Sequence, residues 1–72
     1  MVNITLLQKT IKQKGSSPRE LSNQIGIDTS TLYRRFNNNG EDFTIGEVEA
    51  IAEALNLTNE EFNNIFFAHL VA

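Results

Sequence analysis

The chain has 72 residues, of which 40% are hydrophobic and 21% charged, with a net charge of −3 and no cysteine. These values are typical of one small soluble domain, residues 1–72, and they exclude a disulfide framework and thiolate chemistry. No run approaches the roughly 20 apolar residues that span a bilayer, and residues 1–10 do not resemble a signal peptide. The composition therefore predicts a cytoplasmic protein that does not associate with membranes.

The charges are divided between the two halves of the sequence. All six basic residues precede residue 36 and are accompanied there by two acids, so residues 1–35 carry +6 − 2 = +4. Residues 36–72 contain seven acids and no Lys or Arg, which gives −7. This division predicts one face for an anionic partner and another that repels such a partner or attracts a basic protein. Solvated helix faces explain it equally well, and both interpretations stay open.

Periodic apolar residues and helix-ending signals predict five helices and no strand. The first covers about residues 3–14, because Ile4, Leu7 and Ile11 recur at helical spacing and Gly15 ends the pattern.

The next two helices occupy the most informative segment, residues 17–36. Ser17 is a favoured N-cap, Pro18 suits the first helical position, and the acid three residues after Ser17 completes a capping box. Gly26 tolerates the left-handed conformation that ends a helix, and Asp28 then caps the following one. Two helices joined by a turn of roughly three or four residues containing Gly form the helix-turn-helix signature.

The last two helices begin at further capping boxes. Residues 37–40, Asn-Asn-Asn-Gly, give a turn signal, because both residue types tolerate positive φ. Thr44 with Glu47, and Thr58 with Glu61, mark the two helix starts. Apolar side chains on the facing stripes of all five helices form the predicted core. They are Ile4, Leu7, Ile11, Leu21, Ile25, Leu32, Phe36, Ile45, Val48, Ile51, Leu55, Phe62 and Phe66.

This arrangement resembles the phage Cro and repressor family, which implies an all-α, compact five-helix lambda-repressor-like domain with its helix-turn-helix at helices two and three. The likeness is carried by residues 21–37, with Ile-Gly-Ile at 25–27 and Ser-Thr-Leu-Tyr-Arg-Arg at 30–35. Residues 37–47, followed by 51–57, are similar to small regulators of Gram-positive temperate phages, the modulator-of-repression antirepressors. The likeness spans roughly residues 4–67.

The resemblance also implies a DNA interface, in which the third helix enters the major groove. The positions that match base-reading or partner-contacting ones are Thr29, Ser30, Thr31, Tyr33 and Arg34. Among these, Arg34 has the bidentate reach to read guanine. The positions that match phosphate-contacting ones are Ser17, Arg19, Asn37 and Asn38.

Three positions depart from the family's usual pattern. Pro18 stands where many members place a polar residue that helps hold the DNA backbone. Ser22 replaces a small apolar residue between the two helices, and it requires a hydrogen bond if buried. Asp28 places a negative charge near the expected phosphates, in a chain whose pI is about 4.9.

Two functions follow from the resemblance. The first is a phage-type transcription regulator of the lysis/lysogeny switch, which binds operator DNA through the third helix as a dimer. The alternative is an antirepressor that binds the phage repressor protein and blocks its DNA-binding surface, which an acidic surface on the last two helices would favour. The sequence leaves the choice open.

An enzyme is not expected, because the chain has one His, no Cys and no metal-ligand spacing. We therefore predict no cofactor, no bound metal and no small-molecule substrate. Glu49 and Glu53 are interpreted as a solvated face, and His69 as a surface or interface residue.

The segment 65–72 is unusually apolar. Phe66 and Phe67 are adjacent, so one helix face cannot bury both. Phe67, Leu70 and Val71 are therefore predicted to form a homodimer or partner patch. Alternatively, the tail folds back over the first helix and completes the core.

Overall fold

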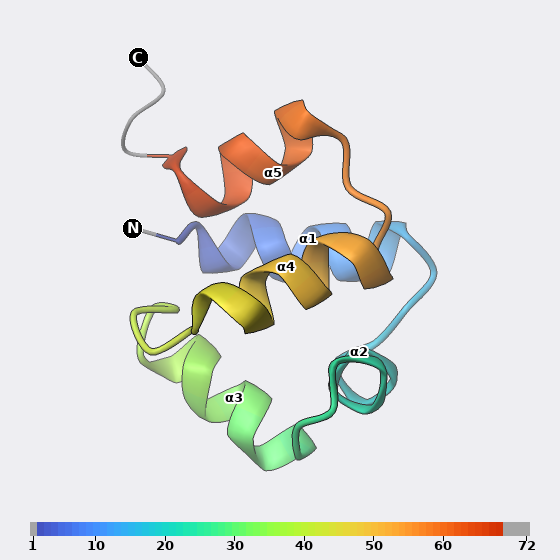
Figure 1. Cartoon of the computed structure of the whole chain (residues 1–72), viewed down its shortest axis with the longest axis vertical. Coiled ribbons are helices and arrows are strands. Elements are labelled where there is room, and N and C mark those ends of the chain that lie inside the picture. Colours follow the sequence, from blue (N-terminus) through green and yellow to red (C-terminus); the bar gives the residue numbers. More distant parts are fainter. Residues whose placement is uncertain (1, 69–72) are drawn as a thin grey trace.

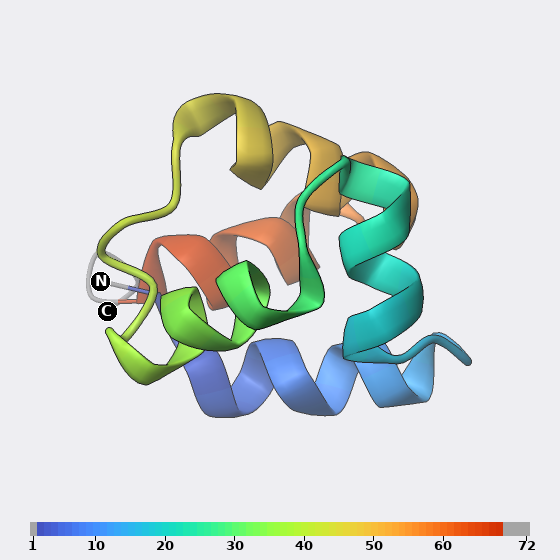
Figure 2. The same ribbon diagram turned by 90° about the horizontal axis from the view of Figure 1, so that it is seen from below.

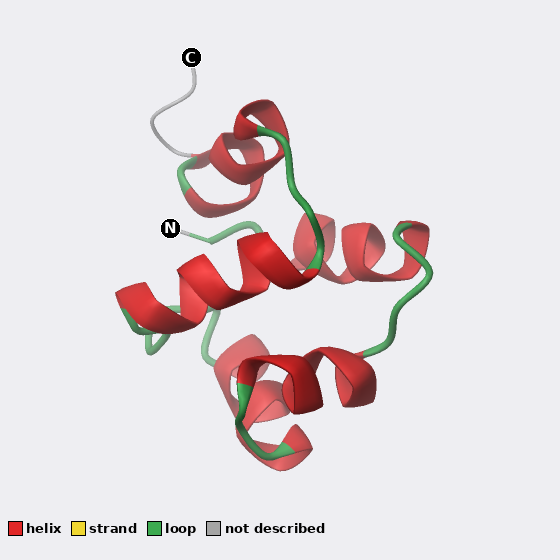
Figure 3. Ribbon diagram, turned by 45° about the vertical axis from the view of Figure 1, so that its right-hand side comes forward, coloured by secondary structure: helices red, strands yellow, loops and turns green. Residues whose placement is uncertain are grey.

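Five helices account for most of residues 2–68, the part of the chain that the computed structural model describes (Figure 1). They are α1 (Ile4–Gln13), α2 (Pro18–Ile25), α3 (Thr29–Asn37), α4 (Ile45–Ala54) and α5 (Asn59–Phe66). Short loops join them, and these described residues contain no strand (Figure 3). The predicted all-α class and order of elements are confirmed.

Complete capping boxes begin α4 and α5, as predicted. The Thr44 hydroxyl accepts the backbone N–H of Glu47 at 3.0 Å, and the Glu47 carboxylate accepts the Thr44 N–H at 3.1 Å. Thr58 and Glu61 repeat this exchange at 3.1 and 2.9 Å. Each box satisfies two N–H groups that a helix start would otherwise leave without partners.

The caps of α2 and α3 are simpler than predicted. Ser17 accepts the N–H of Glu20 at 3.2 Å, but the Glu20 side chain does not complete the box. Asp28 is the N-cap of α3 by position, yet its side chain makes no capping hydrogen bond. The backbone bond from Leu32 N–H to Asp28 C=O, at 3.0 Å, begins the helix instead. The exposed Asp28 carboxylate still lies at the helix end whose dipole favours negative charge.

The helices enclose one apolar core. Eight predicted core residues are buried, and Ile4, Ile25, Val48 and Phe62 pack against them while partly exposed. The eight are Leu7, Ile11, Leu21, Leu32, Phe36, Ile51, Leu55 and Phe66. Ile65 is also fully buried, although the predicted core omitted it.

The prediction that Ile45 belongs to the core is wrong, because 80% of this residue is exposed. Ile45 is the first residue of α4, directly after the capping Thr44. A helical stripe shows which side of a helix is apolar, but it does not show how far along the axis a neighbouring element covers that side. The described part of the fold leaves the first turn of α4 uncovered at this position.

The neighbouring helices do not cover all sides of α3. Figure 2 looks onto α3, which lies between α1 and α4 with α2 at one side. The α2 helix contacts α1, α3 and α4, while α5 packs on α1. The backbone N–H of Asn3 donates to the Ile65 carbonyl at 2.7 Å, which joins the start of the described chain to α5. One side of α3 therefore remains open to a partner.

Candidate nucleic-acid interface

The turn between α2 and α3 has the geometry that the sequence predicted. Gly26 is left-handed, with φ 80° and ψ 29°, and it ends α2. The N–H groups of Gly26 and Ile27 both donate to the Ser22 carbonyl at 3.0 Å. These bonds satisfy the end of α2 and turn the chain sharply toward α3. Residues 18–37 thus form a helix-turn-helix.

A hydrogen bond between the hydroxyls of the buried Ser22 and the half-buried Thr29 joins the two helices. Ser22 is fully buried, and its Oγ lies 2.8 Å from the Arg19 carbonyl and 2.8 Å from Thr29 Oγ1. A serine has one hydroxyl proton, which the carbonyl requires, so Thr29 must donate its own proton to Ser22. The predicted need of Ser22 for a hydrogen bond is therefore met. Thr29, a predicted base-reading residue, keeps only its capacity to accept.

The other predicted contact residues of α3 differ in exposure. Ser30, Tyr33 and Arg34 are exposed, and their i, i+3 and i+4 spacing places them on one face of the helix. The Tyr33 ring meets the Phe36 ring edge-on at 6.0 Å between centroids, yet 48% of Tyr33 remains exposed. Thr31 is half-buried. The structure thus groups three polar side chains on the open side of α3.

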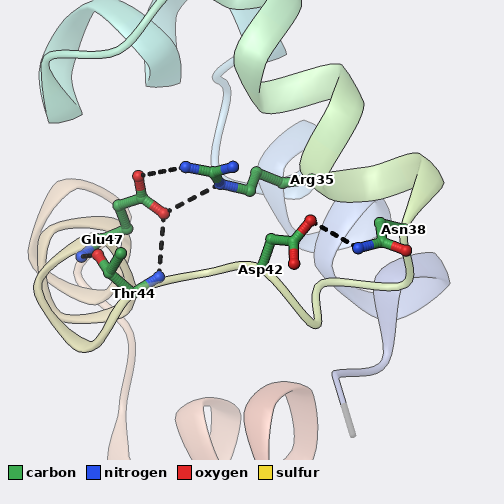
Figure 4. A network of polar contacts seen from close by, with 5 residues as sticks. All are labelled: Arg35, Asn38, Asp42, Thr44 and Glu47. Atoms are coloured by element: carbon green, nitrogen blue, oxygen red, sulfur yellow. Dashed lines mark hydrogen bonds and ion pairs between the residues drawn. The ribbon is translucent and has the colours of Figure 1, made fainter.

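Arg35 is tied to α4 rather than free. Its Nε donates to Glu47 Oε1 at 3.2 Å and its Nη2 to Oε2 at 3.1 Å (Figure 4). This hydrogen bond holds the pKa of Glu47 below its usual value and raises the pKa of Arg35. The two residues of this pair are 12 positions apart in the sequence.

The predicted phosphate-contacting residues lie on two segments. Ser17 and the exposed Arg19 are at the start of α2, and Asn37 and Asn38 are at the end of α3. Asn38 donates through Nδ2 to Asp42 Oδ2 at 2.6 Å, so one of its two amide protons is engaged (Figure 4). The Asp42 contact is a feature that the sequence analysis missed.

The model of the Cro/C1-type HTH DNA-binding domain matches residues 6–67. The chain belongs to this family. No curated protein and no solved structure gives a significant match to it. The family match confirms the resemblance to Cro and repressor proteins, and it identifies the chain as a DNA-binding transcription regulator of the helix-turn-helix class.

Two ion pairs join the halves of this Cro/C1-type domain that carry opposite charge. Lys14 Nζ lies 3.1 Å from Glu61 Oε1, and Arg35 Nη2 lies 3.1 Å from Glu47 Oε2. The other four basic residues form no ion pair with any residue between 2 and 68. They are Lys9, Lys12, Arg19 and Arg34, all of them exposed.

Three further predictions from the sequence concern the pair Glu49 and Glu53, metal binding and membrane-spanning helices. Glu49 and Glu53 are exposed, as expected of a solvated face. Residues 2–68 hold no cluster of three His, Cys, Asp or Glu side chains that would bind a metal ion. Among the same residues, no helix is long and apolar enough to cross a membrane.

The predicted apolar patch is described only in part. Phe66 is buried whereas 42% of Phe67 is exposed, so α5 buries one of the two adjacent rings, as expected. His69, Leu70 and Val71 lie outside the described residues.

Proposed function

We propose that this protein regulates transcription in the lysis/lysogeny switch of a phage by binding operator DNA through α3. The supporting observation is the exposed face of α3 that carries Ser30, Tyr33 and Arg34. Near its two ends, α3 is held by the bond of Thr29 to α2 and the bond of Arg35 to α4. A fixed helix with polar side chains on its open face suits insertion into a major groove.

The hydrogen-bond donors and acceptors of each side chain limit the base edges that it would contact. Arg34 would donate two hydrogen bonds to O6 and N7 of guanine, and the Ser30 hydroxyl would bond either a donor or an acceptor. Thr29 can only accept, so it would meet the amino group of adenine or cytosine. We assign Thr31 and Tyr33 to neighbouring base contacts. Phosphate contacts are assigned to Ser17, Arg19, Asn37 and Asn38.

The test is binding to duplexes from the promoter region of the genome that encodes the protein, measured by fluorescence anisotropy. Arg34→Ala should weaken specific binding by about 1–3 kcal/mol and relax the preference for one base pair. Arg34→Lys is the matched control, because it keeps the charge but loses the planar fork, and we expect it to lose specificity while retaining nonspecific affinity. If neither substitution changes the affinity or the base preference, α3 does not read the operator.

A second candidate function is that of an antirepressor, which binds a phage repressor protein and covers its DNA-binding surface. The observation that favours it is the distribution of charge. Of the two arginines in α3, Arg35 is paired with Glu47, whereas Arg34 has no ion pair among residues 2–68. Residues 36–72 contain no Lys or Arg. Affinity for duplex DNA comes largely from Lys and Arg, whereas an acidic surface steers toward a basic protein face.

Measuring binding to operator DNA and to the cognate repressor at one salt concentration distinguishes the two functions. An antirepressor should release the cognate repressor from labelled operator DNA and co-purify with it, without itself shifting the DNA. A DNA-binding regulator should shift the operator directly and leave the repressor complex intact unless their sites overlap. Failure to co-purify with the repressor would remove the second candidate.

A further inference from the structure

An apolar hollow of about 330 Å³ is lined by residues of the described N-terminus, the 38–44 loop, α4 and α5. These segments lie at one end of the molecule (Figure 1). We call this site the terminal hollow. Val2, Phe43, Ile45, Val48 and Phe67 are among its apolar lining residues. Residues 2–68 leave three large hydrophobic residues exposed, and two of these, Ile45 and Phe67, lie here. Apolar side chains therefore gather at one site on the surface.

Well-packed walls surround the terminal hollow. Gly40 is buried so close to Val2 that an added Cβ would lie 2.7 Å from the Val2 Cβ. The Phe62 ring packs against those of Phe66 and Phe67, at 5.1 and 5.8 Å between centroids. A site of this volume with fixed walls lies within the usual size range for binding pockets, which begins at about 300 Å³.

The border of the terminal hollow is acidic. Glu49 is part of its lining, and the exposed Glu41 and Asp42 directly precede Phe43. These three side chains carry a charge of −3. A second copy of the chain seated on this site by two-fold symmetry would bring two such acidic borders together, which is unfavourable. A basic partner would instead gain complementary charge.

We propose that the terminal hollow docks a protein segment that presents a large apolar side chain flanked by Lys or Arg. This site is separate from the DNA-contacting face proposed for α3, because none of the residues lining the hollow belongs to α2 or α3. For the antirepressor candidate, on which it then rests, it specifies where a basic protein segment would dock. The apolar side chain would fill the hollow while the flanking cations meet Glu49 and the acids before Phe43. Apolar burial would supply affinity and the charges would orient the segment.

The test is an NMR titration of the full ¹⁵N-labelled chain with a helical peptide of Leu and Lys at amphipathic spacing. Two control peptides replace every Lys by Glu or every Leu by Ser. We expect saturable shifts at Val2, Phe43, Ile45 and Val48 with the first peptide alone. Ile45→Ser should weaken that binding about tenfold or more, because the buried apolar contact is lost. This position is exposed, so the thermal midpoint should not change.

A matched pair of charge variants tests the acidic border. Glu49→Gln should weaken binding and reduce its salt dependence, whereas Glu60→Gln, an exposed acid that does not line the hollow, should leave both unchanged. Equal binding of the control peptides, or shifts confined to residues away from the hollow, would overturn the proposal. So would a dimer in light scattering that Ile45→Ser abolishes, because the occupant would then be a second copy. These results are independent of whether α3 binds DNA.

Discussion

Gly40 is a single residue on which the turn after α3 and the packing of the N-terminal segment both depend. Its φ is 73°, and an added Cβ would lie 2.7 and 2.8 Å from two Val2 atoms and 3.1 Å from Ile4 Cδ1. The sequence predicted the turn, because the preference of Asn and Gly for positive φ is local. It did not predict the contact with Val2, because that contact joins residues far apart in the chain.

Gly40→Ala should therefore be more destabilising than an ordinary glycine substitution in a turn. Gly15→Ala is the matched control, because Gly15 has φ 76° but nothing within 4 Å of an added Cβ. Both variants incur the left-handed conformational cost of about 1–2 kcal/mol, and overpacking against Val2 adds about 1–3 kcal/mol for Gly40→Ala alone. Urea unfolding measures the difference. Equal losses of stability would show that the N-terminal segment moves away without cost.

At the scale of helices, Glu47 connects α3 to the start of α4. Its Oε1 accepts both the Thr44 N–H at 3.1 Å and Arg35 Nε at 3.2 Å, while Oε2 accepts Arg35 Nη2 at 3.1 Å (Figure 4). One carboxylate thus caps α4 and holds α3 beside it. The capping role was predictable from the spacing of Thr44 and Glu47, whereas the bond to Arg35 required the tertiary fold.

Glu47→Gln should lower stability in a pH-dependent way. The folded-state pKa of Glu47 lies below the usual 4.5, so its contribution is present above pH 4.5 and is lost as the pH falls through the folded pKa. Gln keeps the capping acceptor but not the charge, and we expect a loss of about 1 kcal/mol at pH 7, or about 4–8 °C in Tm. In thermal unfolding, the difference from the unsubstituted protein should shrink as the pH falls below 4.5.

Glu61→Gln is the control for this prediction. Glu61 also completes a capping box and meets a cation, Lys14, but its side chain is 36% exposed, against 14% for Glu47. Solvent weakens an exposed ion pair, so Glu61→Gln should shift Tm less than Glu47→Gln. Equal shifts for the two variants would show that the α3–α4 pair contributes no more than a surface contact.

The helix starts were predictable because their signals are local. The boxes of Thr44 and Thr58 join residues three apart, and both formed as predicted. Two local predictions failed nevertheless: Glu20 does not complete the box with Ser17, and the Asp28 side chain makes no capping bond. The other failures concern how separate helices meet. Ile45 has the correct spacing for the core, but no element within residues 2–68 buries it. The hydroxyl of Thr29 turns toward Ser22 in the preceding helix. Such outcomes depend on distances between helices, which sequence periodicity does not contain.

For the whole molecule, the fold partly cancels the charge division seen in the sequence. Residues 1–35 carry +4 and residues 36–72 carry −7, but the pairs Lys14–Glu61 and Arg35–Glu47 connect the two halves. Six basic residues therefore leave 6 − 2 = 4 without an ion pair among residues 2–68. The number of phosphates that one domain can neutralise is smaller than the sequence alone indicates.

This count predicts how DNA binding depends on salt. Each neutralised phosphate contributes about −0.9 to the slope of log affinity against log salt, so four cations give a slope no steeper than about −3.6 per domain. Arg34→Ala should make the slope shallower by about 0.9, whereas Arg35→Ala should leave the slope unchanged and lower the thermal midpoint, because Arg35 bonds Glu47. The measurement is anisotropy across a salt series. A steeper slope per domain would mean that Lys14 or Arg35 leaves its carboxylate and binds a phosphate. DNA binding would then break these ion pairs, which would not be permanent contacts of the fold.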